Sequence, residues 1–281
     1  MTIKNLFKLG TTACVLAAQY CMAAYHGARE RSVFQDVETY CMFIGYPRSG
    51  HSLIGSLLDA HPDIVIAHEL DALKYLHARF TKRQLYSLLL ANSRCFAVTG
   101  RQGRHYSYAV PNQWQGRFRH IRIIGDKKGG SSTLRLRANP ELLQRLRKVV
   151  DVPVKMIHVV RNPFDNISTI ATRHCLSLRE VIAYYFALCD TIAITKTQVP
   201  DADLFEMRHE AFVANPRGLL QELCHFLEME ATDDYLEACA GIVFQAPRQT
   251  RTGAQWDYEL IGLVQDHMAR FPFLQGYRYE N

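Results

Sequence analysis

The segment Gly45-Tyr46-Pro47-Arg48-Ser49-Gly50-His51-Ser52, here called the anion loop, restricts the fold more than any other part of the chain. It differs by one residue from the phosphate-binding loop G-x-x-x-x-G-K-[ST], because His51 stands where that loop has lysine. An apolar run, residues 41–44, precedes it, and a helical pattern starting at Leu53 follows it. Backbone N–H groups at a helix start bind anions. The loop therefore predicts an anion site that is poorly equipped for a nucleoside triphosphate with magnesium.

Composition limits the protein class. The 281 residues are 48% hydrophobic and 21% charged, which suits a folded α/β domain and excludes disorder. A net charge of +6 favours an anionic ligand, and no nucleic-acid motif accompanies it. Because no nucleic-acid motif is present, we expect no nucleic-acid partner. The twelve histidines and eight cysteines show no metal-ligand spacing, so we expect no metal site.

Residues 1–38 form an N-terminal segment whose role the sequence leaves open. Lys4 and Lys8 precede an uncharged stretch, residues 9–27, whose length is near the roughly 20 residues of a membrane span. Polar residues interrupt the stretch, so a signal-anchor helix, a cleaved signal peptide and a soluble helix all stand as interpretations. The basic residues slightly favour a membrane-associated location, in a Golgi-type lumen or at a bacterial membrane, over the cytoplasm. We expect residues 39–281 to form one domain.

Apolar runs alternate with helical patterns beyond residue 40. The expected strands are residues 41–44, 64–67, 121–124, 154–160 and 204–207. The expected helices include residues 70–91, one opened by Asn139-Pro140, one headed by the capping box of Ser177 and Glu180, and one opened by Asn215-Pro216. This alternation predicts an α/β fold with a P-loop-like parallel sheet and helices on both faces. Ligands of such sheets bind at the carboxyl ends of the strands, where the anion loop lies.

A second cation follows the strand at residues 154–160. Arg161 comes directly after it, and a helix start is expected near Pro163. A magnesium-dependent NTPase often has an acidic residue near such a strand end. Here the strand ends in a cation, and the lysine of the phosphate loop is missing as well. Both observations disfavour an NTPase. They indicate two anion-binding points at one sheet edge. The alternative for Arg161 is a surface ion pair.

With both motifs in view, the chain resembles the sulfotransferases that use 3′-phosphoadenosine-5′-phosphosulfate (PAPS). Residues 47–52 resemble the family's 5′-phosphosulfate loop, P-[KR]-[ST]-G-[ST]-[ST], and residues 161–169 resemble its 3′-phosphate motif. Residues 57–69 are most similar to the protein-tyrosine and Golgi carbohydrate branches, and residues 207–227 resemble the segment E-x-x-x-x-x-P…F-L. The resemblance covers about residues 41–275. It implies the sulfotransferase fold, in-line transfer of a sulfuryl group from PAPS to a hydroxyl, and no required metal.

The resemblance also implies a donor-binding set. Arg48 stabilises the departing phosphate, and the His51 ring donates to the 5′-phosphate. Arg161 binds the 3′-phosphate with a hydroxyl on the next helix, for which Ser168 and Thr169 both remain candidates. An arginine-rich loop near the C-terminus completes the set, and Trp256 either stacks on adenine or packs. The full set is Pro47, Arg48, Ser49, Gly50, His51, Ser52, Arg161, Ser168, Thr169, Arg248, Arg251 and Gly253.

The catalytic groups implied by the resemblance are Glu69, Arg48, Lys127 and His68. Glu69 takes the place of the carboxylate that removes the acceptor's proton, with His68 as the second candidate base. Lys127 resembles the lysine that steadies the transferring group, and Lys128 is its alternative. An acid at a helix start and lysines in a solvated turn are the non-functional interpretations.

The acceptor remains open between a carbohydrate, a tyrosine-containing molecule and a small molecule. The stretch of residues 93–119, rich in Arg, Tyr and Gln, is expected to line the acceptor side and to favour an acidic acceptor. Two other classes compete with the enzyme: a P-loop kinase of a small molecule, and a non-catalytic protein that binds the nucleotide or a sulfated glycan. A homodimer and membrane anchoring through residues 9–27 stay open.

Overall fold

The computed structural model describes residues 3–100 and 106–280, with side chains from Val15 onward. Its centre is a sheet of five parallel strands in the order β2-β3-β1-β4-β5. The strands are β1 (Thr39–Ile44), β2 (Ile64–Ala67), β3 (Ile123–Asp126), β4 (Val154–Val160) and β5 (Leu204–Arg208). The predicted α/β fold with a parallel sheet is confirmed, and the strands differ from the expected ranges by two residues or fewer at either end.

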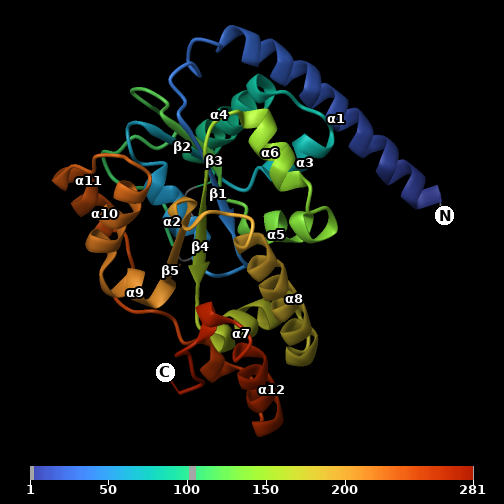
Figure 1. The fold of residues 1–281 in the computed structure, drawn as a ribbon, viewed down its shortest axis with the longest axis vertical. Helices are drawn as coiled ribbons and strands as arrows, with labels where there is room; N and C mark the ends of the chain where they lie inside the picture. The colour runs from blue at the N-terminus through green and yellow to red at the C-terminus, as the bar shows by residue number, and fades with distance from the viewer. Residues whose placement is uncertain (1–2, 101–105, 281) are drawn as a thin grey trace.

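Helices cover both faces of the sheet (Figure 1). One face carries α2 (His51–Leu58), α9 (His209–Ala214), α10 (Pro216–Phe226) and α11 (Asp233–Ala240). The other carries α3 (Ala72–His77), α4 (Lys82–Thr99), α5 (Gly129–Ala138), α6 (Leu142–Val150), α7 (Pro163–His174), α8 (Leu178–Lys196) and α12 (Tyr258–Met268). Three short 3₁₀ helices, η1 (Asp201–Asp203), η2 (Thr250–Gly253) and η3 (Pro272–Leu274), complete the described elements.

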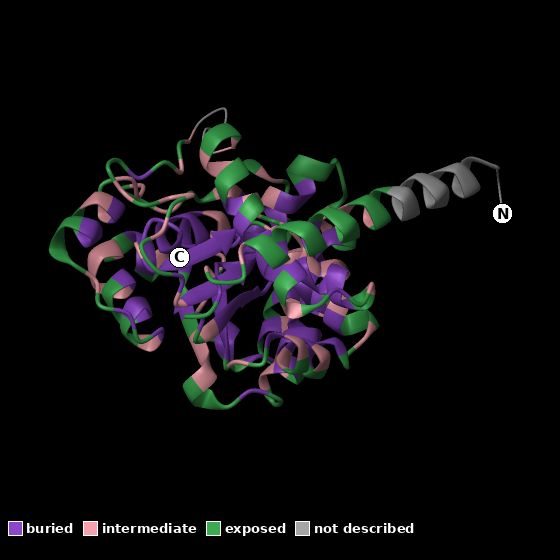
Figure 2. Cartoon of the chain, turned by 90° about the horizontal axis from the view of Figure 1, so that it is seen from above, coloured by how far each residue is buried: buried purple, intermediate pink, exposed green. Residues whose placement is uncertain are grey.

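Strand residues are apolar at successive positions because both faces are covered. In β1, Tyr40, Met42 and Ile44 join the core under α5 and α8, whereas Cys41 and Phe43 join the core under α2. The alternation follows from the period of two in a strand. Strands β1 to β4 lie buried at the centre of the chain in Figure 2, whereas the edge strand β5 is partly exposed.

The expected helix over residues 70–91 is wrong, because the chain forms α3 and α4 with a break between them. Arg79 has a φ of 61°, which an α-helix does not allow. Thr81 and Gln84 then form a capping box that starts α4. The capping box of Ser177 at α8 and the Asn215-Pro216 start of α10 are confirmed, whereas α6 begins at Leu142, two residues after Pro140.

The N-terminal helix α1 (Ile3–Arg29) extends beyond the body of the protein (Figure 1). Its second half packs on α4 through Ala23, and Tyr20 meets Phe80 edge to face with ring centroids 5.0 Å apart. Within residues 3–100 and 106–280, none of the helices combines the length and the apolar character that crossing a membrane requires.

Candidate functional site

Four segments that carry predicted site residues follow strand ends on the same edge of the sheet. The anion loop follows β1, Arg161 follows β4, Lys127 follows β3, and Glu69 lies two residues after β2. Because β1 is flanked by β3 and β4, its loop lies between the Lys127 and Arg161 positions. The parallel sheet thus brings together residues that are far apart in the sequence, such as Arg161 and Arg48, which are 113 positions apart and hydrogen-bonded.

The anion loop leads directly into α2, so backbone N–H groups at the helix start face the site edge. Gly50, which caps α2, has a φ of 100°, and a Cβ there would lie 2.5 Å from His209 Nδ1. Only glycine fits this position. Arg48 also has a positive φ, 71°, and its side chain is exposed. Ser49 Oγ accepts a hydrogen bond from Asn166 Nδ2 at 3.1 Å, which ties the loop to α7.

The His51 ring does not take the predicted place beside a phosphate. It is 6% exposed and lies behind the anion loop, where it meets Phe43 edge to face at 5.7 Å. A Cβ on Gly45 or on Gly129 would approach the ring to 2.8 Å or 2.5 Å, so both glycines make room for it. Burial lowers the pKa of His51 to about 3, which keeps the ring neutral. The expected donation from its ring is therefore corrected: His51 offers the site only its backbone N–H.

Lys127 and Glu69 form the densest polar cluster of the site. The Lys127 side chain is 2% exposed, and its Nζ donates to Ser52 Oγ at 2.8 Å and to Glu69 Oε1 at 3.0 Å. Lys128 Nζ donates to the other carboxylate oxygen at 3.0 Å. Partial burial raises the pKa of Glu69, but the two lysines outweigh it and hold the pKa at about 2. The carboxylate is ionised, and half of its side-chain surface is exposed at the site edge.

The backbone on either side of Glu69 is fixed by two side chains. Glu69 itself has a φ of 61°. His68 N donates to Asn92 Oδ1 at 2.6 Å, and Leu70 N donates to Asp126 Oδ1 at 3.1 Å. Asp126 ends β3 directly before Lys127, so one strand end positions both partners of the pair.

His68, the second candidate base, lies in a different environment from Glu69. Its ring stacks on Phe96 with centroids 3.6 Å apart and planes 4° from parallel. Tyr108 lies on another side, with ring centroids 6.4 Å apart. The stacking on Phe96 indicates that the His68 ring forms part of the wall of the site. Of the two candidate bases, Glu69 is the one hydrogen-bonded to Lys127.

Arg161 is buried, and its described partners are oxygen atoms of uncharged groups. It donates to Arg48 O at 3.1 Å, to Arg248 O at 2.7 Å and to Thr169 Oγ1 at 3.4 Å. Burial lowers the pKa of Arg161, while the negative charges of Asp165 and Glu210 act in the opposite direction. Its Nε is buried without a hydrogen-bond partner among the described residues. A buried guanidinium with a spare donor fits an anionic ligand such as a phosphate.

The two hydroxyl candidates on α7 point in different directions. Thr169 lies beside Arg161, whereas Ser168 is 1% exposed and its Oγ accepts from Trp256 Nε1 at 2.9 Å. Trp256 also meets Phe164 and Tyr279 in edge contacts, with ring centroids 5.2 Å and 6.2 Å apart. The geometry therefore favours Thr169 for the phosphate and gives Ser168 and Trp256 a packing role.

The arginine-rich loop splits into residues with different roles. Arg251 is 3% exposed and forms a buried ion pair with Asp165, which also accepts from Arg251 N at 2.9 Å. This pair holds η2 against α7 and leaves the Arg251 guanidinium turned away from solvent. Arg248 is exposed, and its guanidinium lies over the Phe244 ring at 5.3 Å. Gly253 is also exposed, and a Cβ there would meet no atom within 4 Å.

Sequence reasoning missed several side chains at this edge. Thr250 Oγ1 lies 2.9 Å from Thr169 Oγ1, and the Tyr108 ring lies near the His68 ring, with ring centroids 6.4 Å apart. Neither residue belongs to a motif that its position in the sequence would reveal. Arg173 was also missed, although the helical repeat gives a signal: it lies four residues after Thr169 on α7, on the same helix face.

The stretch of residues 93–119 was expected to line the acceptor side, and the structure describes three of its arginines, Arg94, Arg117 and Arg119. Residues 101–105 lie outside the described part of the chain. Two of the described arginines form ion pairs with acids elsewhere: Arg94 with Glu30, and Arg119 with Asp63. Asp63 precedes β2, so the second pair lies at the amino edge of the sheet, away from the anion loop.

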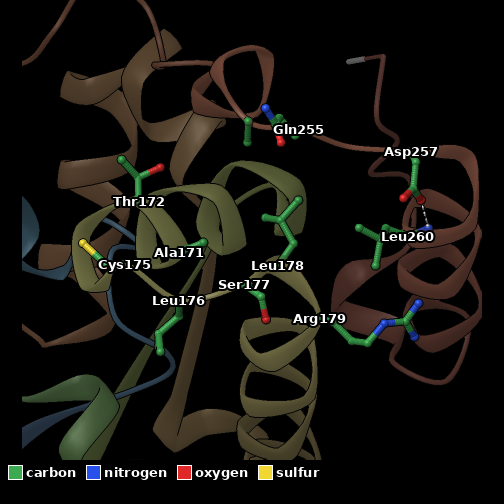
Figure 3. Close-up of a pocket in the computed structure, with 11 residues that line it drawn as sticks. Ala171, Thr172, Cys175, Leu176, Ser177, Leu178, Arg179, Gln255, Asp257 and Leu260 are labelled. Carbon is green, nitrogen blue, oxygen red and sulfur yellow. Dashed lines mark hydrogen bonds between the residues drawn. The ribbon is translucent and has the colours of Figure 1, made fainter.

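A cavity of about 560 Å³ lies elsewhere in the described part of the chain (Figure 3). It opens at the turn between α7 and α8 and at the start of α12, where Asp257 caps Leu260. At the C-terminal end of α7 it is lined by Ala171, Thr172 and Cys175, and neither Thr169 nor Arg161 is among its lining residues. Among the described residues, no group of three or more His, Cys, Asp or Glu side chains is arranged to hold a metal ion.

Comparison with known proteins gives the family. The sequence profile described as the sulfotransferase family matches residues 42–234, which is well over half of the chain. No curated protein sequence matches significantly. Among solved structures, the sulfotransferase domain from the curacin biosynthetic pathway has a TM-score of 0.52 at 13% identity, over 84% of this chain and 98% of that one. The sulfotransferase STF9 from Mycobacterium avium has a TM-score of 0.51 at 12% identity, over 88% and 79%.

The chain therefore belongs to the sulfotransferase family. The resemblance inferred from the anion loop and from Arg161 is confirmed at the level of the family, and so is the enzyme class of PAPS-dependent sulfotransferases. A single sulfotransferase-type α/β domain holds all the described site residues. The particular branch of the family is not decided by these matches.

Proposed function

We propose that the protein transfers the sulfuryl group of PAPS to a hydroxyl of a carbohydrate, a tyrosine or a small molecule, with Glu69 as the base. The observation that carries the proposal is the placement of two separate cationic points on one sheet edge. Arg161 and Thr169 form one, and Arg48 and Lys127 flank the anion loop at the other. A donor with a 3′-phosphate and a 5′-phosphosulfate needs this arrangement. A kinase would need the loop lysine, which His51 replaces.

The reaction follows from the contacts of Lys127 and Glu69. The acceptor oxygen attacks sulfur, the bond between sulfur and the 5′-phosphate oxygen breaks, and the acceptor's proton passes to Glu69. Negative charge develops on the departing oxygen, where Lys127 and Arg48 offer fixed positive charge. Lys127 Nζ already bridges Ser52 of the anion loop and Glu69, so one ammonium group lies between the donor side and the acceptor side.

Donor binding also activates the base in this proposal. In the structure, Lys127 and Lys128 hold the pKa of Glu69 at about 2, which makes it a weak base. When the phosphosulfate draws the Lys127 ammonium toward itself, Glu69 loses one of its two partners, and its pKa rises. The Glu69 carboxylate then gains proton affinity only when the donor is bound. Without the donor it stays ionised and is not protonated by solvent.

The test is binding of PAP, the bisphosphate product of PAPS, followed by a transfer assay. The wild type should bind PAP, and Arg161→Ala and Arg48→Ala should weaken binding by at least tenfold. Glu69→Gln should bind PAP like the wild type while transfer of labelled sulfate falls by about 10²-fold or more. Stabilisation by ATP with magnesium but not by PAP would contradict the proposal and favour a kinase. If the wild type and Glu69→Gln both bind PAP and neither transfers labelled sulfate, the protein is a non-catalytic binder.

A further inference from the structure

The anion loop is held in an unusual backbone conformation. Arg48 has a φ of 71° and Gly50 a φ of 100°, so Ser49 lies between two residues in the left-handed region. This region is unfavourable for arginine, and contacts from the surrounding protein must therefore hold the loop there. One such contact is the hydrogen bond from Arg161 Nη1 to Arg48 O, which is 3.1 Å long. Another comes from Asn166, a residue of α7 that has no assigned role in the site.

The Ser49 hydroxyl is tied into the protein as both a donor and an acceptor. Ser49 is fully buried. Its Oγ donates to Tyr46 O at 2.9 Å and accepts from Asn166 Nδ2 at 3.1 Å. Because both hydrogen bonds are made inside the protein, the Ser49 side chain fixes the shape of the loop, and the backbone N–H groups at the start of α2 are left to face the ligand.

The Asn166 amide is poorly explained by stability alone. Asn166 is fully buried, and its Oδ1 has no hydrogen-bond partner among the described residues. A buried acceptor without a partner lowers the free energy of unfolding, and an apolar side chain of similar size would avoid that cost. Local rules of this kind are broken mainly at functional sites. The bond from Asn166 Nδ2 to the anion loop is therefore the feature that gives this side chain a role.

Asn166 shares its helix face with a residue of the other anion-binding point. Thr169, whose hydroxyl lies beside Arg161, follows Asn166 by three residues on α7. Residues three apart lie on one face of a helix. The same face of α7 thus contacts the anion loop through Asn166 and the Arg161 guanidinium through Thr169. The helix fixes the position of one point relative to the other.

We propose that Asn166 is a positioning residue of the donor site, which acts through Ser49 to hold the anion loop in the conformation that binds the 5′ end of PAPS. The inference rests on the proposed function and adds to it a residue that does not touch the donor. Because Asn166 is bonded to the loop, its loss should weaken binding of a 5′-phosphate and spare binding of a 3′-phosphate at Arg161.

The experiment separates the two ends of the donor with two mononucleotides. Adenosine 5′-monophosphate carries only the 5′-phosphate, adenosine 3′-monophosphate carries only the 3′-phosphate, and competition with labelled PAP measures the affinity of each. Asn166→Ala should weaken binding of the 5′-monophosphate by about fivefold or more and change binding of the 3′-monophosphate by less than about twofold. Thr169→Ala should give the opposite pattern, because its hydroxyl lies beside Arg161.

Two further variants test the route through Ser49. Ser49→Ala breaks the same contact from the loop side, so the test does not depend on the folding of Asn166→Ala alone. The double variant should bind the 5′-monophosphate no more weakly than Ser49→Ala does. Tyr235→Phe is the control, because it removes another buried hydrogen bond, from the Tyr235 hydroxyl to Leu57 O at the far end of α2. It should leave both monophosphate affinities as they are in the wild type.

The contrary outcomes are distinct from one another. Equal losses for both monophosphates, or no loss for either, show that Asn166 does not position the anion loop. Additive effects of Asn166→Ala and Ser49→Ala show that Asn166 does not act through Ser49. If the wild type binds PAP and any of these results appears, the positioning role fails while the donor assignment stands. If the wild type does not bind PAP, the proposed function itself fails.

Discussion

Lys127 Nζ lies 3.0 Å from Glu69 Oε1, so a buried cation from the end of β3 holds a half-exposed carboxylate that follows β2. Lys128 binds the other oxygen, and together the lysines lower the pKa of Glu69 from 4.5 to about 2 against the opposing effect of burial. The structure thus places a carboxylate and its paired cation at the edge where the anion loop begins α2. The consequences can be measured.

Lys128→Gln should move the acid limb of the kcat/KM profile for PAPS to higher pH. Loss of one cation lets the pKa of Glu69 rise from about 2 toward 4.5, so Glu69 becomes protonated at a higher pH as the solution is acidified. The pH–rate profile of the free enzyme reports this change. Lys148→Gln, at an exposed lysine of α6, is the control. An acid limb that does not move would show that Lys128 does not tune Glu69.

Thr169→Ala and Ser168→Ala should separate binding from stability. Thr169→Ala removes the hydroxyl beside Arg161, and we expect PAP affinity to fall by about fivefold, since one hydrogen bond is worth about 1 kcal/mol. Ser168→Ala leaves Trp256 Nε1 without its acceptor, so the free energy of unfolding should fall by about 1–3 kcal/mol with little change in PAP affinity. Calorimetric titration and urea unfolding measure the two effects. The reverse pattern would assign the phosphate to Ser168.

Gly129→Ala should lower the free energy of unfolding by about 1–3 kcal/mol, because its methyl group would lie 2.5 Å from the His51 ring. Adding His51→Ser to Gly129→Ala removes the ring and should restore most of the loss. Denaturant unfolding of both single variants and the double variant measures the coupling. Additive effects would place the ring elsewhere.

Because the pKa of His51 is about 3, donor binding should show no titration of this residue between pH 5 and 8.

Asp165→Ala should destabilise the protein by about 3–5 kcal/mol, since it leaves Arg251 charged and buried without its partner. The double variant Asp165→Ala with Arg251→Met should regain most of that stability, because an apolar side chain replaces the ion pair. Urea unfolding tests this. PAP affinity of the stable double variant then decides whether Arg251 touches the donor: affinity near that of the wild type supports a structural role, and a large loss supports direct contact.

Much of the fold followed from local patterns. Apolar runs of four to seven residues placed all five described strands, because strands buried on both faces need apolar side chains at successive positions. The break at Arg79 was missed, because residues 70–91 keep a helical spacing of apolar residues through it. The chain turns there because Thr81 and Gln84 form a capping box that starts a new helix. Starting this helix is more favourable than continuing α3.

The sequence by itself determined the anion loop, the cation at the end of β4 and the class of enzyme, because each lies in a short segment whose residue types and spacing carry the chemistry. Only the tertiary structure decided the direction of each side chain. The His51 ring points inward because Gly45 and Gly129 leave room for it. The Arg251 side chain points inward because it pairs with Asp165. The pairing of Lys127 with Glu69 also required the fold, because neighbouring parallel strands bring together residues 58 positions apart.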